Sequence, residues 1–350
     1  MKKIIAIVAG GYSREYDVSL RSAQGLDRFI DRTKYDVYHV LLTRNEWSVR
    51  LPDGSMQPID RNNFSFSYNG QTVTFDFAYI TVHGTPGEDG RLQGYFDMLQ
   101  IPYSSCGTLA SALTFNKYTC TQFLKGQEVR VPDALRIRRG QTLPTETIVA
   151  QLGLPVFVKP NEGGSSLGTT KVKEPGRMQS AIHEAFDEAD EVIIERFVPG
   201  IEVTCGCYQT AEKEIVFPLT EVVTDNDFFD YGAKYNGEVQ EITPARIPDE
   251  VADSIRKETL RIYDLVGAKG VIRVDFIIPS DGKPVMLEIN TTPGMTSTSF
   301  IPQQVRAAGL NMTDVTTEII EKMSRIGGNI ENLPMNEHSF PSFWGTNLQK

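Results

Sequence analysis

The sequence predicts an α/β protein made of roughly two or three packed units. Its 350 residues exceed what a single hydrophobic core usually serves. Over about the first 120 residues, apolar strand-like runs alternate with a helical pattern, which favours a parallel sheet flanked by helices. Beyond that point, apolar runs follow one another through glycine-rich or turn-forming segments, which is typical of antiparallel hairpins.

The N-terminal part begins with a buried strand at Ile4–Ala9, a Gly10-Gly11 turn and a helix from about Val18 to Ile30. Further strands are expected at Val37–Leu42 and Phe77–Val82. The polar stretch between these strands contains turn-forming residues, and it predicts inserted hairpins rather than a linker. Their turns are expected at Pro52-Asp53-Gly54 and Asn69-Gly70.

The middle of the chain contains two helices with continuous apolar faces. The first follows Pro175, a residue that suits the first turn of a helix, and its apolar stripe runs from Met178 to Ala189. The second extends from about Val251 to Val266 and ends at Gly267. Strands are expected at Pro155–Lys159, Thr169–Val172 and Val192–Phe197. The polar segment 225–245 is too long for a simple connection and is a candidate functional loop.

Two short runs near the C-terminus, Val271–Ile278 and Val285–Asn290, predict an antiparallel hairpin closed by the turn-forming segment Pro279–Lys283. Side chains alternate between the two faces of a strand, so each run has one face of wholly apolar residues. We expect these faces to belong to the core; they comprise Ile272, Val274, Phe276, Val285, Leu287 and Ile289.

The opposite face of this hairpin is polar. Arg273 and Asp275 share it on the first run, and Glu288 and Asn290 share it on the second. Carboxylate and amide oxygens suit Mg²⁺, while a neighbouring arginine suits a phosphate or a developing oxyanion. The alternative is a salt-bridged, exposed sheet face without a ligand.

Composition excludes several classes of function. The net charge of −10, with no basic run, argues against nucleic acid as the main partner. No apolar stretch approaches the roughly 18 residues that a bilayer requires, and the start reads as a first strand rather than a signal peptide. The cysteines do not form a disulfide framework; Cys205 and Cys207 are expected to be buried free thiols in a reducing cytoplasm.

Two glycine-rich turns are candidate ligand loops. Gly10-Gly11 leads into a helix, where Glu15 would attract an ammonium group and repel a phosphate; the alternative is a tight turn. The loop Gly163–Gly168 joins two strands, and its glycines allow backbone amides to approach phosphates, with Lys159 just before it. The alternative for this loop is a flexible hairpin tip.

Two further segments carry candidate residues. His83 opens a loop that ends at Gly90; it either touches substrate or serves as a capping or packing residue. Gly294, in the turn after the second hairpin strand, could aim its N–H at a reacting oxygen. Met295 is interpreted as ordinary packing.

Taken together and in this order, the motifs closely resemble those of the D-alanine–D-alanine ligase family of ATP-grasp enzymes over residues 4 to 323. The motifs are Gly10–Ser19, His83 with Gly87–Gly90, Val158–Pro160 with Gly164–Gly168, Lys234-Tyr235, Arg273–Asp275 and Glu288–Met295. The resemblance implies an N-terminal α/β substrate domain at 1–120, followed by two ATP-grasp domains that enclose the nucleotide. These would be a central domain at 121–203 and a catalytic domain at 204–350, with a tail from about 325 that the family pattern does not explain.

The resemblance also implies residue roles. Glu15 would bind the ammonium of the first D-alanine, and His83 would contact substrate. Ser165 and Tyr235, linked to Glu15 by hydrogen bonds, would close loops over the site. Arg273 and the Gly294 amide would stabilise the oxyanion, while Ser299 and Phe300 (where the family often has leucine) would hold the acceptor's carboxylate. ATP would contact Lys117, Lys159, Ser166, Glu195, Phe197, Val198, Glu202 and Lys234. Two Mg²⁺ or Mn²⁺ ions would be held by Asp275, Glu288 and Asn290. Glu162 is given no role.

The implied activity is the ATP-dependent joining of two D-alanines through an acyl phosphate, for peptidoglycan precursor synthesis. Loops 161–168 and 225–245 would exclude water while the acyl phosphate exists. Alternatives are a D-alanine–D-lactate ligase, which Tyr235 disfavours, another ATP-grasp carboxylate–amine ligase, or a nucleotide-binding sensor without turnover. The joint presence of Arg273, Glu288 and Asn290 weighs against the sensor. A cytoplasmic homodimer acting on small molecules is expected from the family.

Overall fold

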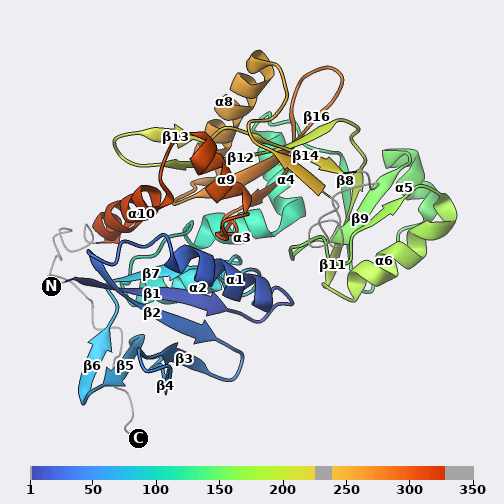
Figure 1. Cartoon of the computed structure of the whole chain (residues 1–350). Helices are drawn as coiled ribbons and strands as arrows, with labels where there is room; N and C mark the ends of the chain where they lie inside the picture. The colour runs from blue at the N-terminus through green and yellow to red at the C-terminus, as the bar shows by residue number, and fades with distance from the viewer. Residues whose placement is uncertain (1, 225–238, 328–350) are drawn as a thin grey trace, which may run out of the picture.

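The computed structural model describes residues 2–224 and 239–327, which three larger sheets organise (Figure 1). The first sheet has the strand order β4-β3-β2-β1-β7, with β2, β1 and β7 parallel. Its strands are β1 Lys3–Gly10, β2 Tyr35–Leu42, β3 Trp47–Arg50, β4 Met56–Pro58 and β7 Phe77–Ile80. The helices beside it are α1 Tyr16–Asp27, α2 Arg91–Met98 and α3 Thr108–Phe115. The predicted parallel α/β unit is therefore present.

Strand β1 is apolar on both faces because both faces are covered. Ile5 and Ile7 pack in one cluster with residues of α1 and of α10 (Met312–Gly327). Ala6 and Val8 face a second cluster that includes α2 and the aromatic residues of the hairpins. Both inserted hairpins form: β3 pairs with β4, and β5 (Ser65–Tyr68) pairs with β6 (Gln71–Thr74) across Asn69-Gly70.

The second sheet is antiparallel, with the order β10-β9-β11-β8. Its strands are β8 Ala134–Arg138, β9 Val156–Pro160, β10 Thr170–Val172 and β11 Glu191–Arg196. Helices α5 (Thr145–Leu152) and α6 (Met178–Phe186) pack on it, and a short 3₁₀ turn at Pro175–Arg177 precedes α6. The glycine-rich loop joins β9 to β10, as the sequence predicts, and α4 (Lys117–Gly126) leads into this sheet.

The third sheet has the order β15-β14-β12-β16-β17, with β13 paired to β12. Its strands are β12 Ile201–Gln209, β13 Glu214–Val216, β14 Thr220–Thr224, β15 Val239–Ile242, β16 Ile272–Ile278 and β17 Val285–Asn290. Helix α8 (Asp249–Val266) packs on it and ends at Gly267, which has a left-handed conformation. Helix α9 (Phe300–Ala307) follows β17.

One expectation for the hairpin β16–β17 is wrong. A bulge shifts the register, so Asp275 lies opposite Glu288 but Phe276 lies opposite Met286. The extra residue turns Met286 into the core and leaves Leu287 lining a cavity with Asp275. Strict alternation assigned Leu287 to the core, and the bulge breaks that alternation.

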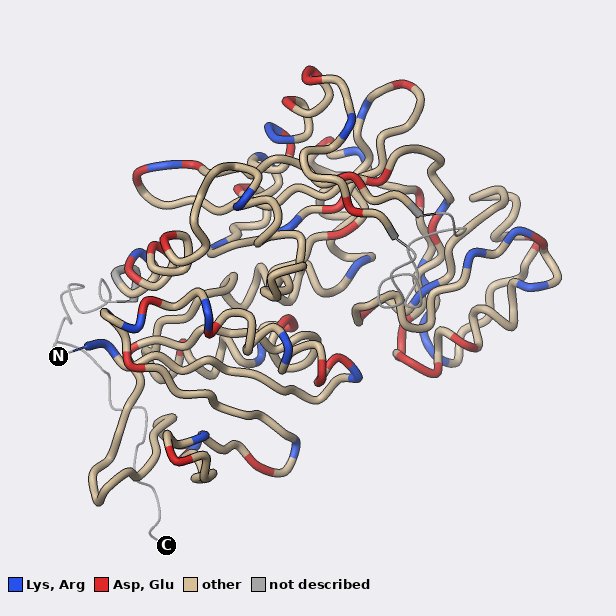
Figure 2. The backbone as a smooth tube through the Cα atoms, viewed as in Figure 1, with Lys and Arg blue, Asp and Glu red and all other residues tan. Residues whose placement is uncertain are grey.

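Element ends differ slightly from the predicted ones. Helix α1 begins at Tyr16 rather than Val18, because its first residues do not belong to the apolar stripe that marks the helix in the sequence. Cys205 and Cys207 are buried free thiols, and Met295 is buried in the core. Within residues 2–224 and 239–327, no helix is both long and apolar enough to cross a membrane. Lysine and arginine are scattered over the described chain rather than gathered in one stripe (Figure 2).

The division into domains at 1–120, 121–203 and 204–350 stays a proposal. Each unit holds one of the three larger sheets, while α4 runs across the first junction and β12 across the second. Most of the predicted loop 225–245 lies outside the described residues, and its end forms β15. The tail falls outside them too from residue 328 onward.

Candidate active site

Two cavities adjoin where the three sheets approach one another. The first, of about 470 Å³, lies between the second and third sheets. The second, of about 520 Å³, is lined by α1, the loop after β7, and the segment from β17 to α9. Both are lined by Lys117, Gly163, Gly164, Ser165, Arg273 and Glu288. A ligand group in one cavity can therefore meet a group in the other at this shared wall.

The structure brings every predicted site residue that it describes to one of these cavities. The first cavity is lined by Lys117, Lys159, Ser165, Ser166, Glu195, Phe197, Val198, Glu202, Arg273, Asp275 and Glu288. The second is lined by Glu15, His83, Lys117, Ser165, Arg273, Glu288, Asn290, Gly294, Ser299 and Phe300. Lys234 and Tyr235 lie outside the described residues.

Two lysines line the first cavity beside acidic side chains. Lys159 forms an ion pair with Glu195 at 2.6 Å, and Lys117 donates from Nζ to the carbonyl of Gly163 at 2.5 Å. Burial, opposed by Glu288 and reinforced by Lys159, lowers the pKa of Lys117. Two lysine side chains that line one cavity can bind the oxygens of a polyphosphate together.

Glu195 has one unsatisfied oxygen. Its Oε2 is paired with Lys159, whereas Oε1 is buried without a hydrogen-bond partner among the described residues. Phe197 follows on the same segment and packs against Phe157, with their ring centroids 5.9 Å apart. A planar group that carries a hydrogen-bond donor would satisfy Oε1 and contact apolar surface at the same time.

The polar face of β16 and β17 forms the floor between the cavities. Arg273 donates to both oxygens of Asp275, from Nε at 2.8 Å and from an Nη at 2.7 Å. Asn290 donates to Asp275 Oδ2 at 3.2 Å. Burial opposes the charge of Arg273, but Asp275 and then Glu288 raise its pKa. Arg273 therefore stays a cation here, and its guanidinium lies 5.1 Å from the ring centroid of Phe300.

The oxygen atoms on this face form a donor set that suits a hard metal ion. Among the described residues, no group of three or more His, Cys, Asp or Glu side chains is gathered so that it could hold a metal ion. Asp275 and Glu288 supply carboxylates and Asn290 an amide, and all three offer the hard oxygen atoms that Mg²⁺ prefers. They fit an ion that also takes ligands from water and from a bound phosphate.

The glycine-rich loop reaches Glu15, which lies just before α1. Ser165 donates a hydrogen bond from Oγ to Glu15 Oε1 at 2.5 Å. Ser165 and Ser166 have φ values of +53° and +57°, a left-handed conformation that is unfavourable for side-chain-bearing residues. Such strained conformations are concentrated at functional sites, and here the hydrogen bond from Ser165 to Glu15 helps to offset the cost.

Gly164 allows this close approach. A Cβ at Gly164 would lie 2.6 Å and 2.8 Å from the two carboxylate oxygens of Glu15. Only a glycine therefore lets the loop cover Glu15 in its present position. The sequence showed a glycine-rich loop, but it did not show what this glycine faces.

His83 is buried at the rim of the second cavity. Its Nε2 forms a hydrogen bond with Ser22 Oγ at 3.0 Å, and Ser22 also accepts from the backbone N–H of Met295 at 3.4 Å. Burial lowers the pKa of His83, with Arg273 adding to this and Glu15 opposing it. Ser22, which sequence reasoning missed, links His83 to the turn that carries Gly294.

The turn before α9 is tightly built. Ser299 precedes the helix. Its hydroxyl oxygen accepts a hydrogen bond from the backbone N–H of Thr296 at 3.2 Å and lies within hydrogen-bond distance, 2.7 Å, of Thr296 Oγ1. Gly25 on α1 touches the same turn so closely that a Cβ there would lie 2.3 Å from the carbonyl oxygen of Met295. Residue 25 is therefore restricted to glycine by a contact that no local pattern shows.

Glu88 is a further acid of the second cavity that sequence reasoning left unassigned. It lies in the loop that begins at His83 and accepts a hydrogen bond from the N–H of Gly84 at 2.7 Å. Burial, followed by the charge of Glu15, raises the pKa of Glu88 to about 8, although Lys117 opposes the shift. Glu88 is thus protonated at neutral pH in the folded protein.

We expect Glu88→Gln to remove part of the pH dependence of stability. The folded protein keeps a proton that the unfolded chain loses above its ordinary pKa near 4.5, so wild-type stability falls as the pH rises from about 4.5 to about 8. Glutamine cannot ionise. The melting temperature of the variant should exceed that of the wild type by about 3 °C more at pH 9 than at pH 5. Glu174→Gln, at an exposed position, is the control; a constant offset for Glu88→Gln would refute the shift.

Comparison with known proteins finds two family models. The model described as "D-ala D-ala ligase N-terminus" matches residues 4–106, and that described as "D-ala D-ala ligase C-terminus" matches residues 124–321. The D-alanine--D-alanine ligase of Parabacteroides distasonis is 64% identical over 321 residues, which cover 92% of this chain and 97% of the relative. That of Phocaeicola vulgatus is 61% identical, with 92% and 99% covered.

Solved structures are similar over nearly the whole chain. The VanG D-Ala:D-Ser ligase from Enterococcus faecalis has a TM-score of 0.82 at 31% identity, with 93% of this chain and 100% of that chain covered. The D-alanine--D-alanine ligase from Bacillus anthracis complexed with ATP has a TM-score of 0.75 at 26% identity, with 94% and 99% covered.

Proposed function

The chain belongs to the D-alanine–D-alanine ligase family, and on this premise we propose how its two cavities divide the reaction. The enzyme joins two D-alanines to D-alanyl-D-alanine at the expense of ATP, a step of peptidoglycan precursor synthesis. The observation that carries the proposal is the wall shared by the two cavities. ATP occupies the first cavity, the amino acids occupy the second, and phosphoryl transfer takes place between them.

In the first cavity, the triphosphate is held by charge. Lys117 and Lys159 bind phosphate oxygens, with the amides of the loop at Ser166 and with Lys234. The purine lies against Phe197 and Val198, where Glu195 Oε1 accepts from its exocyclic amine, and Glu202 binds the ribose. This arrangement gives the unsatisfied oxygen of Glu195 a hydrogen-bond donor and gives the buried ammonium of Lys117 an anionic partner.

In the second cavity, the first amino acid is bound by its ammonium group and the second by its carboxylate. Glu15 binds the ammonium of the first D-alanine, and His83 lies beside it. Ser299 and the backbone amide of Phe300, at the start of α9, bind the carboxylate of the second. A helix N-terminus favours this carboxylate because its first N–H groups have no acceptor within the helix and its dipole is positive there.

The reaction then proceeds in two steps. A carboxylate oxygen of the first D-alanine attacks the γ-phosphorus of ATP, and ADP leaves, which gives an acyl phosphate. The ammonium of the second D-alanine first loses a proton. The neutral amine then attacks the acyl carbon, and phosphate leaves with the second amine proton as the peptide bond forms. Arg273 and the Gly294 N–H stabilise the oxyanion of the tetrahedral intermediate. Two Mg²⁺ (or Mn²⁺) ions, which Asp275, Glu288 and Asn290 would hold, supply positive charge for the approach of the two anions.

Phosphate release that requires both ATP and D-alanine tests this function. Protein shown to be folded should release phosphate only when both are present, and release without D-alanine or no release at all would refute it. Tyr235 favours an amine acceptor, so we propose D-alanine rather than D-lactate as the second substrate. Competition between the two acceptors across pH distinguishes them, because only the amine must lose a proton before attack.

We further propose that the enzyme is a cytoplasmic homodimer. The free thiols of Cys106, Cys120, Cys205 and Cys207 are all buried, which suits a reducing compartment. Met98 on α2 and Leu109 on α3 are 79% and 81% exposed, and these two helices are neighbours. Large exposed apolar residues of this kind favour an interface between copies. Light scattering should give twice the chain mass, and Met98→Lys/Leu109→Lys should lower it to one chain; a wild-type monomer would contradict the proposal.

A further inference from the structure

The first turn of α4 is capped by a residue from the glycine-rich loop. The N–H groups at the start of a helix have no partner within it, so they need one elsewhere. Lys117 N–H donates to the backbone carbonyl of Asn161 at 3.0 Å, and Tyr118 N–H donates to Asn161 Oδ1 at 2.8 Å. The third, on Thr119, donates to the helix's own cap, Asn116, at 3.0 Å.

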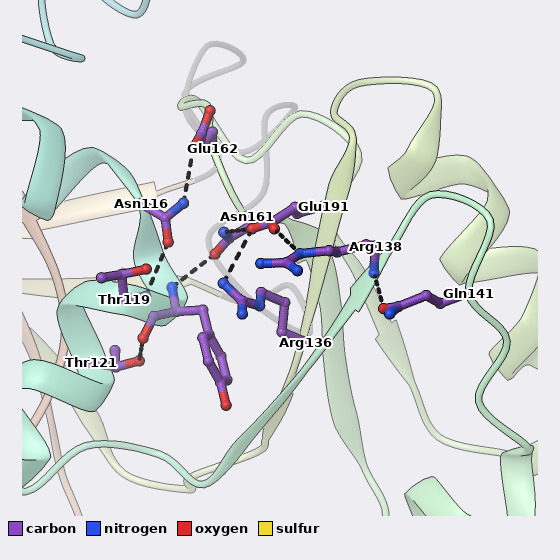
Figure 3. A network of polar contacts seen from close by, with 10 residues as sticks. Asn116, Thr119, Thr121, Arg136, Arg138, Gln141, Asn161, Glu162 and Glu191 are labelled. Carbon is purple, nitrogen blue, oxygen red and sulfur yellow. Dashed lines mark hydrogen bonds and ion pairs between the residues drawn. The ribbon is translucent and has the colours of Figure 1, made fainter.

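Asn161 is fully buried, and its remaining hydrogen-bonding groups are directed to the second sheet. Its backbone N–H donates to the carbonyl of Glu191 at 2.9 Å, and its Nδ2 donates to Glu191 Oε2 at 2.8 Å. Figure 3 shows Asn161 between α4 and Glu191, which lies at the start of β11. The two ends of the Asn161 amide thus have different partners, which fixes its orientation.

Glu191 is itself held in place. Arg138 donates to its Oε1 at 2.8 Å, and Arg136 lies 3.6 Å from Oε2. Burial acts in the opposite direction, but the hydrogen bond from Arg138 and the charge of Arg136 lower the pKa of Glu191 below its usual range. Asn161 is therefore anchored to a rigid, ionised acceptor on the sheet rather than to a mobile side chain.

Lys117 donates two hydrogen bonds to this loop. Its backbone N–H bonds Asn161, and its Nζ bonds the carbonyl of Gly163. Between them, Glu162 Oε1 accepts from Asn116 Nδ2 at 2.9 Å. Three consecutive loop residues thus bond the cap of α4 and its first two residues, which ties the loop that covers the first cavity to Lys117.

We propose that Asn161 is a positioning residue for ATP binding: it fixes the positions of Lys117 and of the glycine-rich loop relative to each other. This inference rests on the proposed function, in which Lys117 and the loop bind the triphosphate. Lysine has a long side chain with many rotamers, and fixing its backbone and the adjacent loop lowers the entropy lost when phosphate binds. Removal of the Asn161 side chain deletes the bonds to Tyr118 N–H and Glu191 Oε2, so the start of α4 keeps its backbone bond to the loop but loses its side-chain link to the second sheet.

The direct test is Asn161→Ala with two controls. We expect the KM for ATP to rise about tenfold, while the KM for D-alanine changes by less than about twofold. Gln141→Ala removes an amide at the far end of the same network, where it accepts from Arg138 N–H, and should leave both constants unchanged. Ile182→Ala lowers the stability of the same domain from its core and controls for destabilisation alone. An unchanged KM for ATP in Asn161→Ala would overturn the inference.

If Asn161→Ala does not fold, two substitutions that exchange the amide of Asn161 with the carboxylate of Glu191 provide a second test. Asn161→Asp still accepts from Tyr118 N–H but places two carboxylates together, and it should weaken ATP binding. Adding Glu191→Gln restores a donor and should return the affinity for a non-hydrolysable ATP analogue to within about threefold of the wild type. Failure of the double variant to recover, with the single variant impaired, would count against the hydrogen bond as the cause.

Lys117→Met separates this inference from the proposed function. If Asn161 acts through Lys117, then Asn161→Ala should add less than about twofold to the loss of ATP affinity already caused by Lys117→Met. Independent, multiplicative losses would overturn the inference alone. If Lys117→Met binds the ATP analogue as the wild type does, the role of Lys117 in the proposed function is wrong and the inference falls with it.

Discussion

Arg273→Ala should lower the turnover number by about 10³ while changing the affinity for ATP by less than about threefold. Arg273 is the one predicted oxyanion side chain on the wall between the two cavities. Its charge is most useful when the acyl carbon becomes tetrahedral, because negative charge then develops on the oxygen beside it. ATP in the ground state keeps its contacts with Lys117 and Lys159, so its binding should be largely retained.

Two control variants address the structural role of Arg273. Since Arg273 donates to both oxygens of Asp275, its removal also leaves a buried carboxylate without that partner. Arg273→Met keeps most of the volume of the side chain, and Arg273→Lys keeps the charge but loses the two-point contact. Turnover should fall least for lysine. Equal losses in turnover and in the affinity for an ATP analogue, in folded protein, would contradict the oxyanion role.

The sequence predicted the polar floor of the site because its signal is local. Alternation along two short runs was sufficient to group Arg273 with Asp275, and the paired registers Asp275–Glu288 and Arg273–Asn290 follow from the hairpin. The bulge at Leu287 was not predictable in the same way. Which residue of a strand is left unpaired depends on the packing of both faces, and no residue type in this run marks it.

Residues that act across the interior were beyond local patterns. Glu15 and Ser165 are 150 positions apart, and the sequence brought them together only through the family resemblance. Glu88 and Asn161 were left without roles, because the properties of each come from a residue that is distant in the sequence. The charge of Glu15 acts on Glu88, and the start of α4 bonds Asn161. The signal that could have drawn attention to Asn161 is its position next to Pro160, at the end of a buried strand and the start of a glycine-rich loop.

Gly164→Ala should reduce kcat/KM for D-alanine by about 10²-fold without unfolding the protein, since small displacements of a substrate-binding group have effects of this size. A Cβ at this position would lie 2.6 Å from one oxygen of Glu15 and 3.0 Å from its Cδ. The carboxylate that binds the first ammonium must then move, or the loop must lift from it. Either shift disturbs the hydrogen bond from Ser165 to Glu15, whereas the binding of an ATP analogue alone should change by less than about threefold.

Because the backbone conformation at Gly164 is open to alanine, the effect of Gly164→Ala reports the contact with Glu15 and not backbone strain. Gly163 has a φ of +125°, where an L-residue is strained, but Gly164 has no such left-handed φ, so alanine can adopt its conformation. Gly176→Ala, in the same domain, is the matched control because nothing lies within 4 Å of its Cβ position. It should leave kcat/KM unchanged. If Gly164→Ala also keeps the wild-type kcat/KM for D-alanine, Glu15 can bind the ammonium from another position, and the close cover of Glu15 by the glycine-rich loop is not required for the reaction.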